Sequence, residues 1–127
     1  MVSLMAAFLI VHGALHLAVW LPPAPTDGQG RAPFAPDHSA VLTRTHVSVT
    51  ASHLVAVWLA GAAAVAYVLG GLVVALGSGW AFVLAGLAAV LGLGLKATFF
   101  NPWLSVGILL DAAVLMSALW SWPLTLG

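Results

Sequence analysis

The sequence has very little charge and no cysteine. Its 127 residues include three Lys or Arg, three Asp and no Glu, so that only 5% of the chain is charged. Globular domains are about one-quarter charged, and a chain with so little charge could not stay soluble as a monomer. The absence of Cys excludes thiolate metal ligands and a CxxCH haem-attachment motif. The neutral net charge, without a basic patch, excludes nucleic-acid binding.

Long apolar runs fill the sequence instead. Hydrophobic residues make up 63% of the chain, and the mean hydropathy is +1.15. A helix that crosses a bilayer needs about 20 mostly apolar residues. We therefore predict an all-α integral membrane protein, an antiparallel up-down four-helix bundle that forms a single transmembrane domain in the lipid bilayer. Its spans are expected at about 2–21, 47–70, 80–98 and 103–122.

The first span could alternatively be a signal peptide. No Lys or Arg precedes it, and its end, LPPAPT, lacks an A-x-A-like cleavage site. These two features favour an uncleaved spanning helix.

Helix-breaking residues separate the spans. Residues 22–45 are expected to form a long loop, whose first part holds five of the seven prolines. A glycine-rich segment, 70–79, marks the second break, although its apolar LVVAL stretch leaves the end of span two open by several residues. Asn101 and Pro102 mark a tight third turn.

Positive residues indicate the orientation. Arg31, Arg44 and Lys96 all fall on the side of the long loop. The positive-inside rule then predicts a cytoplasmic long loop, with both termini outside a bacterial inner membrane. Tryptophans are expected at both interfaces, Trp20 and Trp103 at the long-loop end and Trp80, Trp120 and Trp122 at the other, with Trp58 near mid-span.

Polar side chains gather in one half of the predicted membrane region. His12 and His16 lie one turn apart, about 13 Å and about 7 Å inside the long-loop end of span one. His53 and Asp111 lie about 10 Å and about 13 Å inside the same face. Because ionisable groups in hydrocarbon cost about 2.5 kcal/mol or more, they are expected to face the bundle interior, with His12 near the level of His53. Lys96, about 5 Å inside, is expected to extend toward the interface.

A transition metal is the first ligand that such a site could take. HxxxH places two imidazoles on one helical face, so that His12, His16, His53 and Asp111 could together ligate Zn, Cu or Fe. This interpretation describes a small accessory subunit of a larger bacterial membrane assembly.

Three further interpretations stay open. A b-type haem could be held by His12 or His16 opposite His53, with Gly13 and Gly61 leaving room for the macrocycle. The same residues could carry protons in a quinone-linked membrane oxidoreductase or proton-relay module. Finally, the histidines could be hydrogen-bonded core residues of a purely structural protein.

The segment VHGALHL resembles the first helix of uncharacterised small four-helix membrane proteins of bacteria, chiefly actinobacteria. Those proteins carry an HGxxHL motif there and a Gly followed four residues later by Asp or Asn in the last helix. The matching residues here are His12, Gly13 and His16, then Gly107 and Asp111. A more distant resemblance is to DoxX-like proteins, whose HGxxKL pattern has Lys at the position of His16. That resemblance implies a four-helix bundle and an accessory role near quinone-linked oxidoreductases.

Overall fold

The computed structural model describes residues 1–21 and 39–121, and these form helices without a strand. The helices are α1 (Val2–Trp20), α2 (Ala40–Arg44), α3 (Val49–Ala75), α4 (Ala81–Thr98), the 3-10 helix η1 (Pro102–Leu104) and α5 (Ser105–Leu119). Four segments are long and apolar enough to cross a membrane: α1, α3, α4, and η1 together with α5. The structure thus confirms the predicted all-α four-helix fold, and the composition makes it a multi-pass membrane protein.

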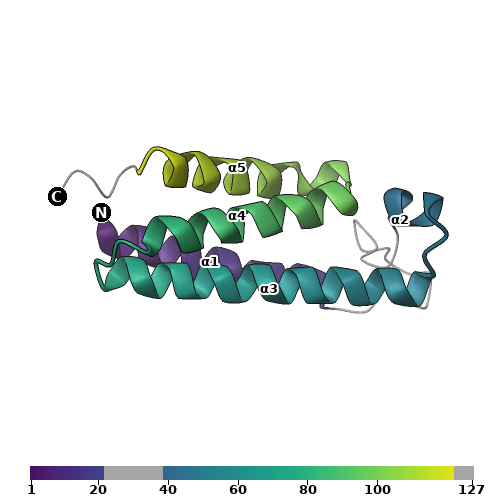
Figure 1. The fold of residues 1–127 in the computed structure, drawn as a ribbon, viewed down its shortest axis with the longest axis horizontal. Coiled ribbons are helices and arrows are strands. Elements are labelled where there is room, and N and C mark those ends of the chain that lie inside the picture. Colours follow the sequence, from purple (N-terminus) through teal and green to yellow (C-terminus); the bar gives the residue numbers. More distant parts are fainter. Residues whose placement is uncertain (22–38, 122–127) are drawn as a thin grey trace.

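The four long helices lie side by side, with each neighbour running in the opposite direction (Figure 1). Packing is extensive between α1 and α3, between α3 and α4, and between α4 and α5. By contrast, α1 and α5 make few backbone contacts with each other. The N-terminus and the end of α5 lie at one end of the bundle, whereas α2 and η1 lie at the other (Figure 1).

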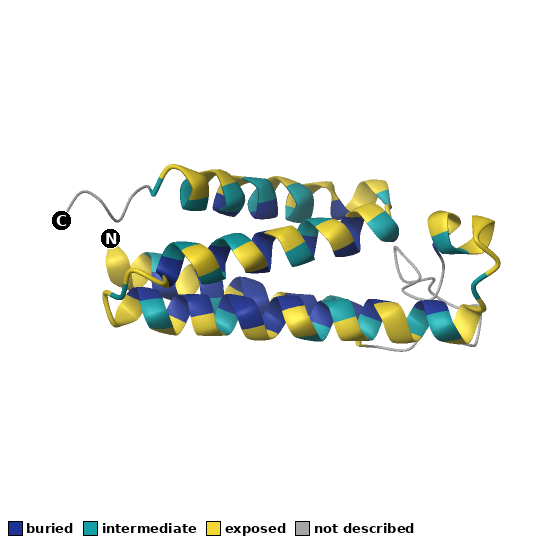
Figure 2. Cartoon of the chain, viewed as in Figure 1, coloured by how far each residue is buried: buried dark blue, intermediate teal, exposed yellow. Residues whose placement is uncertain are grey.

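Small residues allow α1 and α3 to approach closely. A Cβ added at Gly71 would lie 2.7 Å from Ile10 Cγ1 and 2.8 Å from the Ala6 carbonyl oxygen. One added at Gly13 would lie 2.8 Å from Tyr67 Cβ. Buried residues accordingly concentrate where α1, α3 and α4 face each other, whereas α5 has few of them (Figure 2). Such close approach strengthens dispersion contacts where the hydrophobic effect cannot drive helix association.

Helix α3 continues past its predicted end at residue 70. Gly70 and Gly71 do not break the helix, which ends at Ala75. Gly71 instead provides the space into which α1 packs. As a result α3 has 27 residues against the 19 of α1, and it extends well beyond the C-terminal end of α1.

The segment expected to be one long loop contains a short helix. Residues 22–38 lie outside the described part, but α2 forms directly after them. Ser39 caps α2 by accepting a hydrogen bond from the Leu42 amide. Its hydroxyl also donates to the Thr98 carbonyl at 2.5 Å, which ties α2 to the end of α4.

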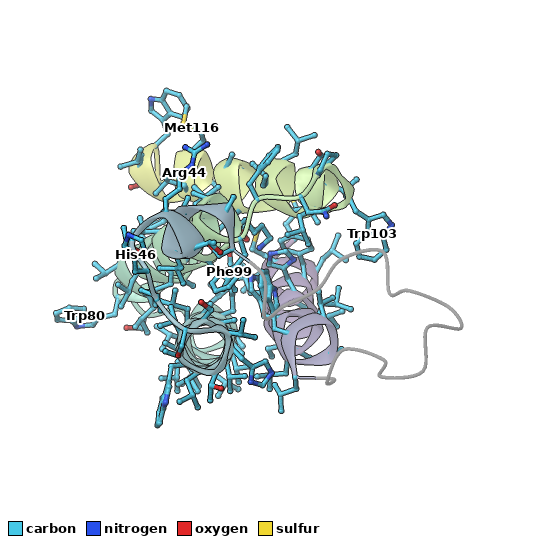
Figure 3. The ribbon with its side chains drawn as sticks, turned by 90° about the vertical axis from the view of Figure 1, so that its right-hand side faces the viewer. Arg44, His46, Trp80, Phe99, Trp103 and Met116 are labelled. Carbon is cyan, nitrogen blue, oxygen red and sulfur yellow. The ribbon has the colours of Figure 1, made fainter. Side chains whose placement is uncertain are left out.

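The tryptophans only partly follow the expected interfacial pattern. Trp80, Trp103 and Trp120 are exposed near the ends of the bundle. Trp58, near mid-span, is 76% exposed on the outer surface of the bundle. Trp20 is instead buried and packs edge-on against Phe99, with ring centroids 5.4 Å apart. Figure 3, seen from the α2 end, shows Phe99 near the bundle centre and Trp80 and Trp103 projecting outward. Trp122 lies outside the described residues.

The close contact between α1 and α3 predicts that replacing a glycine of α3 by alanine destabilises the protein at Gly71 but not at Gly61. We expect Gly71→Ala to lower the free energy of unfolding by about 1–3 kcal/mol relative to Gly61→Ala, because overpacking forces the helices apart. Gly61 is the matched control, since it lies on the same helix and a Cβ there meets nothing within 4 Å. Unfolding in mixed micelles of a mild detergent and SDS measures the difference. Equal stability of the two variants would refute the role assigned to Gly71.

Candidate functional site

A fully buried carboxylate, Asp111, is the centre of the site. Its Oδ1 accepts hydrogen bonds from His12 Nε2 at 2.7 Å and from the Tyr67 hydroxyl at 2.6 Å. Its Oδ2 accepts one from Lys96 Nζ at 2.6 Å. Asp111 has no exposed surface, and His12, Tyr67 and Lys96 are buried around it. Three helices, α1, α3 and α4, therefore each direct a hydrogen-bond donor to one carboxylate on α5. These four residues, together with His16, are called the polar cluster below.

The hydrogen-bond pattern assigns the tautomers of both histidines. The ionised carboxylate only accepts, so His12 donates through its Nε2–H. His16 Nδ1 lies 3.0 Å from the His12 carbonyl oxygen, which also only accepts, so His16 donates through Nδ1–H. His16 Nε2 is then unprotonated in the neutral ring and accepts a hydrogen bond from Lys96 Nζ at 2.9 Å. With neutral imidazoles, the charges of Lys96 and Asp111 cancel.

Lys96 points into the bundle rather than toward the interface, contrary to the sequence-based expectation. It is only 4% exposed and forms an ion pair with Asp111. The Cα–Cβ bond of a helical residue tilts toward the helix N-terminus, and for Lys96, near the end of α4, this direction leads into the bundle. The aliphatic stem therefore carries the ammonium group inward to the carboxylate.

Two glycines leave room for this ion pair. A Cβ added at Gly92 of α4 would lie 2.8 Å from Asp111 Cγ, and one added at Gly107 of α5 would lie 2.6 Å from Lys96 Cε. Each helix of the hairpin thus has a glycine opposite the charged residue of the other helix. His12, Gly13 and His16 of the HGxxHL motif and the Gly107–Asp111 pair of α5 all contribute to this region.

His53 lies away from the other predicted site residues. It is 14 positions before Tyr67 on α3, which corresponds to about 21 Å along the helix axis. The predicted alignment with His12 assumed that the C-terminal end of α1 and the N-terminal end of α3 lie at the same level. Instead Trp20, the last residue of α1, shares an apolar core with Ala56 and Ala60, which lie further along α3 than His53. His53 therefore lies beyond the end of α1, and its buried Nε2 has no hydrogen-bond partner among the described residues.

This register also bears on the haem hypothesis. His53 is not opposite His12 or His16, and the space beside Gly13 is filled by Tyr67 and Ala64 of α3. A pair of facing axial imidazoles from α1 and α3 is therefore not formed.

The structure brings together three groups that could hold a metal ion. His12, His16 and Asp111 are buried, and each offers a ligand atom within 4.8 Å of the others. In the observed arrangement these groups pair with one another and with Lys96. The ammonium group lies between His16 Nε2 and Asp111 Oδ2, where it supplies the positive charge that a metal ion would supply.

A cavity of about 580 Å³ borders the polar cluster, between α1 and the η1–α5 segment. His12, His16 and Lys96 contribute to its wall. The remaining lining is apolar or aromatic: Leu15, Val19, Trp20, Pro102, Trp103, Leu104, Val106, Gly107 and Leu110. The cavity lies where the bundle is least closely packed, because α1 and α5 make few backbone contacts. It combines hydrogen-bonding groups at one place with lipophilic walls elsewhere.

No family model, curated protein or solved structure matches this chain. The geometry of the site is therefore the basis for inferring a function.

Sequence reasoning missed the role of Tyr67. It is the only tyrosine of the chain and lies within a span. A buried phenol hydroxyl needs a hydrogen-bond partner, so its position alone could have suggested a place in the site. Its ring also packs edge-on against His12, with centroids 4.7 Å apart.

Removing the carboxylate should expose the cost of an unpaired ammonium group. We expect Asp111→Leu to lower the free energy of unfolding by about 3–5 kcal/mol, because Lys96 stays buried without its counter-ion. The double variant Lys96→Met/Asp111→Leu is expected to regain part of this loss. Tyr67 and His12 lose their acceptor in both variants, so the difference isolates the ammonium group. A double variant no more stable than the single one, by unfolding in mixed micelles, would contradict this account.

Proposed function

We propose that this protein is a proton-relay module of a bacterial membrane assembly and serves a quinone-type ligand held in the cavity beside the polar cluster. The observation that carries the proposal is the juxtaposition of the two features. A hydrogen-bonded chain from Tyr67 through Asp111 to His12 and Lys96 adjoins a lipophilic cavity. A network that only held helices together would not need such a cavity.

The charge balance of the polar cluster favours an uncharged ligand. The positive charge of Lys96 is already compensated by Asp111 at 2.6 Å. A phosphate or carboxylate head group would therefore bring an uncompensated charge into a low-dielectric region, which is strongly unfavourable. A neutral carbonyl group needs only a hydrogen-bond donor.

Such a donor is present in Lys96. An ammonium group has three N–H bonds, and two of them point to His16 Nε2 and Asp111 Oδ2. No further partner of Lys96 occurs in the described part of the chain. Since Lys96 contributes to the cavity wall, its third N–H can hold a ligand carbonyl. The cavity volume lies in the usual range of about 300–1,000 Å³ for small-molecule sites.

A quinone also gives the proton relay a task. Reduction of a quinone to a quinol takes up two electrons and two protons, so the binding site must deliver protons inside the membrane. His12 can pass a proton because it bonds Asp111 through Nε2, while its Nδ1 has no partner among the described residues. The electrons would come from a redox partner in the assembly, which makes this chain an accessory subunit.

The proposed setting is the bacterial inner membrane, with the α2 end facing the cytoplasm and both ends of the chain outside. Support comes from Arg44, a positively charged residue on α2 at that end of the bundle. The cavity lies in the same half of the membrane and would exchange protons with that side.

Quinone binding can be followed through the tryptophans of the cavity. We expect decylubiquinone to quench the fluorescence of the purified protein saturably. Trp103→Phe should reduce the quenching amplitude, because Trp103 contributes to the cavity wall. Trp58→Phe is the matched control, since Trp58 is exposed on α3 and does not line the cavity.

Proton transfer through the polar cluster can be measured separately in the same purified, quinone-bound protein. Electrochemical reduction of the bound quinone should produce an infrared difference signal from a carboxyl group, and Asp111→Asn should remove it. Saturable binding without this signal would leave a quinone site but end the relay hypothesis. Quenching that never saturates, or that both tryptophan variants reduce equally, would refute the quinone site.

Metal binding is the second candidate, and the convergence of His12, His16 and Asp111 within 4.8 Å favours it. The ammonium group of Lys96 competes for the same position. We therefore expect Lys96→Met to bind Zn²⁺ more tightly than the parent protein, as measured by competition with a chromogenic chelator. His12→Leu in the Lys96→Met background is expected to abolish the gain. Stoichiometric Zn, Cu or Fe in the purified parent protein would instead make metal binding the leading function.

A further inference from the structure

Lys96 carries a primary amine at the wall of a lipophilic cavity, and it is the only lysine of the chain. Its Nζ lies 2.9 Å from His16 Nε2, which can accept a proton, and 2.6 Å from Asp111 Oδ2. An amine in an apolar site with a neighbouring base is the arrangement that forms Schiff bases with carbonyl compounds.

We propose that Lys96 captures lipophilic aldehydes covalently, forming in the cavity an iminium ion whose counter-ion is Asp111. The inference rests on the proposed function in one respect, because both require the cavity to admit a lipophilic carbonyl compound. It goes beyond that function in assigning a covalent bond to a named nitrogen atom.

The reaction balances with the groups at hand. His16 Nε2 takes one proton from the ammonium group, and the freed amine attacks the aldehyde carbon to form the C–N bond. A second proton moves from nitrogen to the former carbonyl oxygen. His16 then returns its proton to the hydroxyl group, which leaves as water while the nitrogen electron pair forms the C=N bond. The net change converts an ammonium ion and an aldehyde into an iminium ion and water.

Charge conservation makes this step compatible with the buried site. The nitrogen is positive before and after the reaction, so Asp111 keeps its counter-ion. The iminium retains one N–H, which can still donate to Asp111 Oδ2, whereas the contact with His16 is given up. A reaction that neutralised Lys96 would instead leave a buried carboxylate unpaired, at a cost of several kcal/mol.

The walls of the cavity define the ligand class. Apart from the polar cluster, they consist of side chains such as Leu15, Val106 and Leu110, with Trp20 and Trp103 at the α2 end. These surfaces suit an alkyl or isoprenoid chain. The expected ligand is therefore an uncharged long-chain aldehyde that enters from the membrane.

Reductive trapping tests the proposal with little background. Purified full-length protein in lipid bilayers is incubated with decanal and sodium cyanoborohydride, which reduces an iminium to a stable secondary amine. Peptide mapping by mass spectrometry then locates the adduct. The only competing amine is the N-terminus at Met1, which is 79% exposed and serves as an internal control.

With decanal, we expect the adduct at Lys96 to exceed that at Met1 by about tenfold or more, because burial of the alkyl chain concentrates the aldehyde in the cavity. Glyoxylate, a charged aldehyde, should label Met1 alone. Lys96→Arg keeps the cation beside Asp111 but cannot form an imine, and it should lose the main adduct. Decanal adducts confined to Met1 in the parent protein would overturn the inference whether or not the variant folds.

Decylubiquinone separates this inference from the proposed function. Protection of Lys96 from decanal would support one shared cavity. Saturable quinone binding without a Lys96 adduct would refute covalent capture and leave the quinone site. An adduct at Lys96 without any quinone binding would refute the quinone site and leave covalent capture.

Discussion

The arrangement of the bundle depends on one ionised carboxylate placed in hydrocarbon. An isolated Asp in the middle of a span costs about 2.5–3.5 kcal/mol or more, and three donors on three other helices surround Asp111 at 2.6–2.7 Å. Gly92 and Gly107 are small because the ion pair occupies the space of their side chains. The register between α4 and α5 follows from the same requirement, since a shift of one turn would separate Lys96 from its counter-ion.

The polar cluster also lies between two apolar cores. One core, which includes Leu9, Val74 and Val114, fills the bundle toward the chain ends. The other, with Trp20 and Phe99, fills it toward α2. Between them, the hydrogen bond from His12 to Asp111 joins α1 to α5, whose backbones make few contacts with each other. A ligand in the cavity would therefore act on the group that connects these two helices.

Hydropathy predicts the four spans, because a helix that must bury its backbone in lipid has little freedom in length or composition. The number of residues from the end of each predicted span also places His12, His16 and Asp111 in one half of the membrane, and in the structure these three residues lie together. The same residue count fails for His53, because the position of α1 along α3 depends on the close packing at Gly71 rather than on composition. The inward direction of Lys96 follows from side-chain geometry, which a count of residues from the interface does not include.

The sequence separation of the two charges bears on how the chain enters its membrane. Lys96 and Asp111 are 15 residues apart and lie on α4 and α5, which form one hairpin. Their ion pair involves neither α1 nor α3. During synthesis this hairpin can leave the insertion machinery as an electrically neutral unit, with His12 and Tyr67 completing the hydrogen bonds afterwards. Two residues that would each oppose insertion alone are thus inserted together.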